Sequence, residues 1–148
     1  MEQRRIKKVF VNGGISAQFI ADSIAKHAVK THIGAHDIFL GQVRNDVIDG
    51  KTVCAIDYSC YQEMAEEKFH CIRELAFSRF DLICMHIHHS IGPVKTGEIS
   101  LFVFVSAKHR KSAMDACRWI VEEIKGTVPI FGKEVFEDDT YSWKVNVK

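Results

Sequence analysis

The 148-residue sequence predicts a single α+β domain, over residues 1–148, whose sheet is mixed and mostly antiparallel. Three observations support this prediction. Three segments show the apolar spacing of amphipathic helices, and seven short apolar segments are typical of strands. The expected order is β-α-β-β-α-β-β-α-β-β with many short connections, which favours antiparallel pairing. No repeat, low-complexity tract or linker divides the chain.

The first strand is expected at residues 6–11, where polar and apolar residues alternate. Gly13 and Gly14 end this strand. Ser16 is a good N-cap for the helix that follows, because its hydroxyl can accept a hydrogen bond from a free backbone N–H. The apolar positions of this helix are Phe19, Ile20, Ile24 and Ala28.

The next strand is expected at residues 34–43, and it ends beside Arg44. Residues 45–51 hold two aspartates, an asparagine and a glycine, which predicts a turn or a mobile loop. Residues 53–58 form a further strand. A second helix is expected over residues 62–79, with helical spacing of Ala65, Phe69, Ile72 and Ala76.

Two more strands are expected at residues 82–88 and 99–107, with turns between them at Gly92-Pro93 and at residues 95–98. The third helix is predicted over residues 109–127, with Ser106 as a possible N-cap. One face of this helix carries Ala113, Ala116, Cys117, Ile120 and Ile124.

Pro129 ends the third helix, and the segments 130–136 and 141–145 are expected to form a closing hairpin.

The composition argues against several classes of function. A formal net charge of +1 argues against broad binding of nucleic acid or of a membrane surface. The apolar runs are too short for a spanning helix, and the N-terminus lacks the apolar region of a signal peptide. Five scattered cysteines without a Cys-x-x-Cys pair indicate reduced thiols, more typical of small buried side chains than of a nucleophile. The expected location is therefore the cytoplasm.

A few cations occupy special positions in this nearly neutral chain. Arg44 follows an apolar strand, His109 and Arg110 open a helix, and Lys125 lies in the last turn of that helix. A helix N-terminus with two cationic side chains suits an anion. Each position also has a simpler interpretation, because Arg44 can be a solvated strand end and the helix dipole favours Lys125. The pattern predicts a pocket for a small anionic molecule.

The length of the third helix adds a constraint. Arg110 and Lys125 are fifteen residues apart, or about 22 Å along a straight helix. A small ligand cannot touch both in one chain. If both belong to one site, they come from different subunits, and a homodimer follows.

His86, His88 and His89 raise the question of a metal site. His86 and His88 share one face of the expected strand, and no further ligands with motif spacing are visible. We therefore expect no metal. We also expect no cofactor, because the sequence has no Gly-x-Gly-x-x-Gly motif, phosphate-binding loop or Gly-x-Ser-x-Gly elbow.

The stretch from Gly34 to Trp143 resembles the large, catalytic subunit of molybdopterin synthase. The resemblance rests on the order and spacing of six landmarks, which are Phe39-Leu40-Gly41-Gln42-Val43-Arg44-Asn45, Tyr61-x-x-Met64-Ala65-Glu66, Ile91-Gly92, Ser106-Ala107-Lys108-His109-Arg110, Lys125, and Pro129-Ile130-Phe131-Gly132-Lys133-Glu134. It implies an α/β hammerhead fold and a homodimer within a heterotetramer. The partner is a small ubiquitin-like sulfur carrier whose C-terminal Gly-Gly is charged as a thiocarboxylate. Two sulfurs pass in turn to cyclic pyranopterin monophosphate, which makes the dithiolene of molybdopterin in molybdenum cofactor biosynthesis.

The resemblance also implies roles for individual residues. Lys125 matches the catalytic lysine, and Lys133 is the second catalytic candidate. The substrate-binding positions are Gln42, Val43, Arg44, His109, Arg110, Gly132 and Glu134.

One departure from the family concerns the second lysine, because Gly132 occupies its usual position. The following residue, Lys133, would point to the opposite face of a regular strand, so it reaches the pocket only if a bulge at Gly132 changes the direction of its side chain. Alternatively, the chain works with one cation fewer, Lys108 supplies the charge, or catalysis is impaired. The competing hypothesis is therefore a catalytically silent paralogue that binds the carrier or a phosphorylated ligand. A generic dimeric structural domain is a third, weaker alternative.

Overall fold

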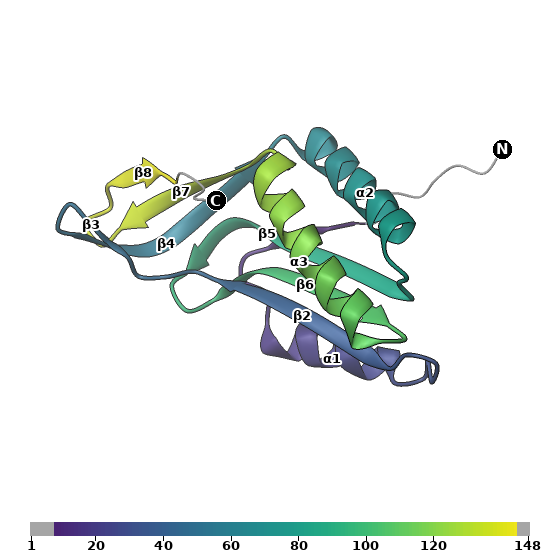
Figure 1. Cartoon of the computed structure of the whole chain (residues 1–148). Coiled ribbons are helices and arrows are strands. Elements are labelled where there is room, and N and C mark those ends of the chain that lie inside the picture. The colour runs from purple at the N-terminus through teal and green to yellow at the C-terminus, as the bar shows by residue number, and fades with distance from the viewer. Residues whose placement is uncertain (1–7, 145–148) are drawn as a thin grey trace.

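The computed structural model describes residues 8–144 (Figure 1). In this part of the chain the helices are α1 (Ala17–His27), α2 (Gln62–Arg79) and α3 (Arg110–Thr127). The strands are β1 (Phe10–Asn12), β2 (Ala35–Gln42), β3 (Val47–Ile48), β4 (Lys51–Cys60), β5 (Cys84–Lys95), β6 (Ile99–Ala107), β7 (Ile130–Phe136) and β8 (Tyr141–Trp143). The order agrees with the predicted one except for the added strand β3. Residues 6, 7 and 145, which the sequence placed in strands, lie outside the described residues.

The strands form one sheet in the order β2-β6-β5-β4-β7-β8, and each neighbouring pair in this order is antiparallel. Strand β1 pairs with β5 in parallel, and β3 pairs with β4. The predicted α+β class, with a mixed and mostly antiparallel sheet, is confirmed. Helices α2 and α3 cover one face of the sheet, and α1 covers the other (Figure 1).

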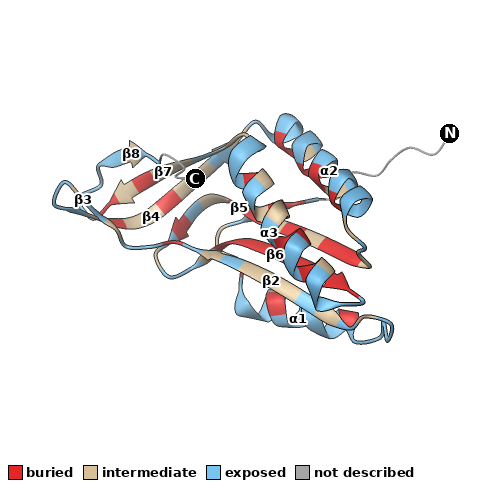
Figure 2. Ribbon diagram, viewed as in Figure 1, coloured by how far each residue is buried: buried red, intermediate tan, exposed pale blue. Residues whose placement is uncertain are grey.

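The strand β6 separates two apolar cores because its side chains alternate between the faces of the sheet. Leu101, Val103 and Val105 pack with the buried faces of α2 and α3. Phe102 and Phe104 pack with α1 on the opposite face. Figure 2 shows β6 buried along most of its length. The apolar faces predicted for α2 and α3 are the buried ones.

The predicted turn at Gly92-Pro93 is wrong, because β5 continues through both residues. Residues 84–89 of β5 pair with β6, whereas residues 92–95 pair with β4. Gly92 lies where the strand changes partners, and its φ of +83° is open to glycine at low cost. The Gly-Pro pair therefore marks a bend within a long strand.

The segment 45–51 is more ordered than expected. It contains the two-residue strand β3, which pairs with the start of β4. Asp49 and Gly50 connect the two strands with φ values of +51° and +76°. Positive φ at both central residues is the conformation that suits a tight hairpin, and Asp-Gly is a favoured sequence for it.

Of the two predicted N-caps, Ser16 is confirmed and Ser106 is wrong. The Ser16 hydroxyl accepts a hydrogen bond from the Phe19 N–H at 3.1 Å, so Ser16 is the N-cap of α1. Ser106 is a buried residue of β6 rather than the cap of α3, and its Oγ lies 2.7 Å from His36 Nδ1. His109 holds the N-cap position of α3 without a side-chain hydrogen bond to the helix. In the described residues, no helix is long and apolar enough to cross a membrane.

Candidate active site

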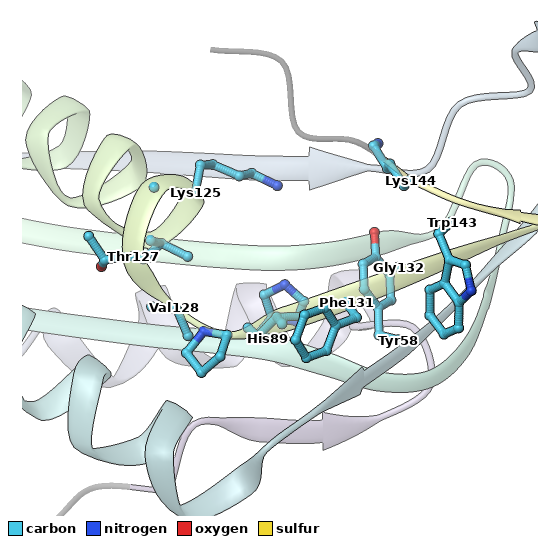
Figure 3. A pocket seen from close by; sticks show the side chains of 13 residues that line it. Tyr58, His89, Lys125, Thr127, Val128, Phe131, Gly132, Trp143 and Lys144 are labelled. Atoms are coloured by element: carbon cyan, nitrogen blue, oxygen red, sulfur yellow. The ribbon is translucent and has the colours of Figure 1, made fainter.

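A pocket of about 410 Å³ lies where α3 ends and β7 begins (Figure 3). Pro129 cannot continue the helix, so the chain turns there into β7 and brings Phe131 and Gly132 beside the end of α3. Lys125 and Lys144 reach the pocket from α3 and from the end of β8. Two lysines that are nineteen residues apart in the sequence therefore line the same pocket.

The two lysines repel each other at the edge of the pocket. Figure 3 shows both side chains on the same side of it. Lys125 is exposed at the surface, yet the protein atoms around its amine lower its pKa by desolvation, and the positive charge of Lys144 lowers the pKa further. A lowered pKa leaves a larger share of Lys125 as the neutral amine, which can accept a proton.

His89 and Tyr58 lie in the wall of the pocket, with ring centroids 5.1 Å apart and nearly perpendicular planes. His89 donates from Nδ1 to the Ser90 carbonyl at 2.8 Å. Burial lowers the pKa of His89 to about 4 despite this hydrogen bond, and the charge of Lys125 adds to the effect. His89 is therefore neutral at pH 7 and does not compete with the lysines for an anion.

The Tyr58 hydroxyl donates to Ser100 Oγ at 3.2 Å. Burial raises the pKa of Tyr58, and the negative charge of Glu134 raises it too. The phenol therefore stays protonated and remains a neutral hydrogen-bonding group in the pocket.

The proposed bulge at Gly132 is wrong. The ladder between β4 and β7 is regular there, with Tyr58 opposite Gly132 and Asp57 opposite Lys133. Lys133 lies outside the pocket, and its amine is 4.7 Å from the centroid of the Tyr141 ring. A regular strand sends consecutive side chains to opposite faces, so Gly132 faces the pocket and Lys133 does not.

Lys144 lies beside Gly132. The Lys144 N–H donates to the Gly132 carbonyl at 2.8 Å, and a Cβ added to Gly132 would lie 3.7 Å from the Lys144 Cβ and 3.0 Å from Ile56 Cγ2. A side chain at position 132 would therefore crowd Ile56, and Lys144 is the cation beside this position. Sequence reasoning missed Lys144, although the register of the predicted closing hairpin would have placed it opposite Gly132.

The basic residues predicted at the start of α3 are far from this pocket in the same chain. His109 and Arg110 are exposed at the N-terminal end of α3, and Lys125 is in its last turn. Lys108 is also exposed at the N-terminal end. One chain therefore does not place Lys108 beside Gly132, where an additional cation was sought.

The segment after β2 is also separate from the pocket. Gln42 and Arg44 are exposed, and Arg44 Nη2 contacts Asp46 Oδ2 at 3.2 Å. Val43 is buried, its N–H donates to the Glu98 carbonyl at 3.0 Å, and its own carbonyl accepts from the Gly97 N–H at 2.8 Å. These two backbone hydrogen bonds hold Val43 against the turn at residues 97–98. Contact between Val43 and a substrate stays a prediction. Glu134 is buried behind the pocket lining.

The model of the family described as MoaE protein matches residues 15–127, which include α1 to α3. The chain belongs to the MoaE protein family. A molybdopterin synthase catalytic subunit from Pyrococcus abyssi is 41% identical over 104 residues, which are 70% of this chain and 70% of that protein. Proteins named molybdopterin synthase catalytic subunit are enzymes of molybdopterin biosynthesis. The matches to longer relatives from rice and Arabidopsis span 58% and 56% of their length.

Solved structures agree with the family assignment. The X-ray structure of molybdopterin synthase from Staphylococcus aureus superposes with a TM-score of 0.81 at 29% identity, and the match covers 93% of this chain and 96% of that chain. A complex of subunits 1 and 2 of the molybdopterin-converting factor from Helicobacter pylori 26695 shares the fold, with a TM-score of 0.78 at 19% identity over 91% of this chain and 88% of that one.

Proposed function

We propose that this chain is the catalytic subunit of a molybdopterin synthase, which transfers sulfur from a thiocarboxylated small carrier subunit to cyclic pyranopterin monophosphate. The observation that carries the proposal is Lys125, an amine of lowered pKa in a pocket with a second cation, Lys144. The position of Lys125 within a member of the MoaE family supports the same function.

The pocket residues have distinct tasks in this reaction. The carrier sulfur attacks a carbon of the pterin that bears the cyclic phosphate, so a carbon–sulfur bond forms as the carbon–oxygen bond to that phosphate breaks and the ring opens. Water then cleaves the acyl–sulfur bond, which leaves the sulfur on the pterin and a carboxylate on the carrier. The neutral amine of Lys125 accepts the proton from the attacking water. The main task of Lys144 is to lower the pKa of Lys125 by its positive charge, and it also adds to the positive potential around the substrate phosphate. A second carrier delivers the second sulfur.

The surface around the pocket suits a protein partner. Tyr61, Phe131 and Trp143 are exposed, and the rings of Tyr61 and Phe131 are 5.6 Å apart. Exposed aromatic side chains are enriched at protein interfaces. Phe131 and Trp143 line the pocket itself (Figure 3). We assign this surface to the small ubiquitin-like carrier, whose C-terminal Gly-Gly lacks side chains and fits between the aromatic rings.

A homodimer of this chain completes the site. Arg110 and Lys125 lie at opposite ends of one helix, about 22 Å apart. In the described residues, β2 is an edge strand that pairs only with β6, and such an edge can pair with another chain. Arg44, His109 and Arg110 of one subunit then bind the substrate phosphate beside Lys125 of the other. With two carriers the assembly is a heterotetramer.

The proposed location is the cytoplasm. The five cysteines are free thiols, although Cys71 is exposed and only Cys84 and Cys117 are buried as expected. Burial raises the pKa of Cys117 to about 12, which keeps this thiol protonated. Unpaired thiols are typical of a reducing compartment.

A single-turnover assay tests the proposal. Purified protein is mixed with thiocarboxylated small subunit and cyclic pyranopterin monophosphate, and the dithiolene product is measured. We expect product together with loss of the thiocarboxylate. If the carrier binds without product while an established synthase is active in parallel, the chain is the silent paralogue and the proposal is wrong.

A further inference from the structure

The opposite face of β5 carries a second cluster of reactive side chains. Cys84 and His86 are alternate residues of β5, so both point toward α1. His27, the last residue of α1, faces them, and its Nε2 lies 3.0 Å from His86 Nε2. One donor atom from each of the three residues lies within 4.8 Å of the other two. His27 and Cys84 are buried.

The hydrogen bond on the far side of the His27 ring directs its lone pair into the cluster. His27 Nδ1 lies 2.7 Å from the Ser23 carbonyl. A carbonyl only accepts, so Nδ1 carries the hydrogen, and the Nε2 of the neutral ring presents its lone pair to His86. This arrangement is typical of metal-binding histidines, in which a carbonyl fixes the tautomer and the ring orientation.

The sulfur of Cys84 is also held from outside the cluster. The Lys30 amine donates to Cys84 Sγ at 2.9 Å. Metal-bound thiolates commonly accept such hydrogen bonds from the surrounding protein. The Phe104 ring, with its centroid 4.7 Å from that of His27, contributes an apolar wall.

We propose that His27, Cys84 and His86 bind one divalent transition metal ion, zinc, with a water molecule in the fourth position. Two imidazole nitrogens and one thiolate are preferred zinc ligands. Two nitrogens on a tetrahedral zinc lie roughly 3.3 Å apart, close to the 3.0 Å between His27 Nε2 and His86 Nε2. By binding His27 of α1 and both Cys84 and His86 of β5, the ion links the end of the helix to the strand. His86 and His89 point to opposite faces of the strand, so this site is separate from the Lys125 pocket.

This proposal departs from the expectation of no metal, which rested on the lack of further ligands with motif spacing. The expected strand places Cys84, His86 and His88 on one face, but the remaining ligand is His27, fifty-nine residues before His86. His88 is outside the cluster, because its ring stacks on Phe102 with centroids 5.8 Å apart.

Cobalt and zinc binding to the untagged protein tests the proposal. After treatment with a chelator, the protein is titrated with Co²⁺ and then with Zn²⁺. We expect one ion per chain, a thiolate-to-cobalt charge-transfer band that zinc removes, and a higher melting temperature with zinc. A wild-type protein that gives no such band and binds no zinc overturns the proposal.

Variants assign the ligands. His27→Gln, His86→Gln and Cys84→Ser should each weaken binding by more than the roughly 10- to 100-fold cost of losing an outer-shell partner. His88→Gln, on the same face of β5, and Cys71→Ser, an exposed thiol, should bind like the wild type. Circular dichroism confirms folding. If Cys84→Ser does not fold, His27→Gln at the helix end provides the same test. Undiminished binding by folded His27→Gln and His86→Gln would contradict the assignment.

Discussion

The two ends of α3 carry basic residues in opposite surroundings. At the N-terminal end, His109 and Arg110 are exposed and oppose the helix dipole. At the C-terminal end the dipole favours Lys125, but the pocket desolvates its amine and Lys144 repels it. The exposed side chains at the first end can donate hydrogen bonds to an anion. The amine at the second end is suited to proton transfer.

In the proposed homodimer, each site combines the two ends of α3 from different subunits. The helix separates the anion-binding end from the proton-transfer end by about 22 Å. Both ends are exposed, but the C-terminal end borders a pocket that β7 and the residue after β8 also line. Under this proposal, a second copy brings its N-terminal end to each Lys125 pocket.

The largest expected effect comes from Lys125→Ala, which removes the proton acceptor. We expect kcat to fall by about 10²- to 10⁴-fold, the usual contribution of general acid–base catalysis. The residue is exposed, so folding and dimerisation should be unchanged. Lys111→Ala is the matched control on the same helix, because it removes only an exposed ion pair with Asp115. Single-turnover rates give the comparison, and full activity of Lys125→Ala would remove the lysine from the mechanism.

The next effect concerns His89 and the pH dependence of stability. The folded pKa of about 4 lies below the ordinary value of 6.5, so the unfolded chain binds more protons between these values. The free energy of unfolding should therefore rise with pH across this window, by about 3 kcal/mol.

Urea denaturation at several pH values measures the difference between the wild type and His89→Gln. This difference should grow from pH 4 to pH 7. His109→Gln, which removes an exposed histidine, should not reproduce the trend. A difference that stays constant with pH would contradict the burial of a neutral His89.

A smaller effect is expected from Arg110→Ala at the other end of α3. Loss of a charge-assisted hydrogen bond to the substrate phosphate should lower kcat/KM by about 10- to 100-fold, mainly through KM. Steady-state kinetics separates the two parameters, and the neighbouring Lys111→Ala is the control. An unchanged KM would mean that the N-terminal end does not bind the substrate.

The smallest effect is expected from Lys144→Ala. Its charge lowers the pKa of Lys125, so its loss should raise that pKa. Since the neutral amine is the active form, the rising limb of the pH–rate profile should move to higher pH, and activity below that limb should fall several-fold. Lys133→Ala should have less effect, because the Lys133 amine packs on Tyr141. The reverse order would favour Lys133 as the second cation.

Local patterns in the sequence predicted most of the fold. The apolar spacing of α2 and α3 identified their buried faces, and Ser16 identified the start of α1. The errors arose where tertiary pairing overrides local signals. Gly92 was interpreted as a turn because the sequence does not show that β5 changes from β6 to β4 at this point.

The candidate site could be predicted only in part. Lys125 lies in the described pocket, and Gly132 faces it. Lys144 was missed because its place depends on the register of β7 and β8, and Lys133 was considered only because a bulge could have re-aimed it. His27 was missed as a neighbour of His86 because the contact depends on how α1 packs on the sheet.

Mixing two inactive variants tests most directly whether the ends of α3 from different subunits form one site. Lys125→Ala and Arg110→Ala proteins are mixed in equal amounts under conditions that exchange subunits, and sulfur transfer is measured at a substrate concentration where each variant alone is nearly inactive. We expect about a quarter of wild-type activity, because half of the dimers are mixed and one of their two sites is intact. No gain over the separate variants, once mixed dimers are verified, would contradict a site shared between subunits.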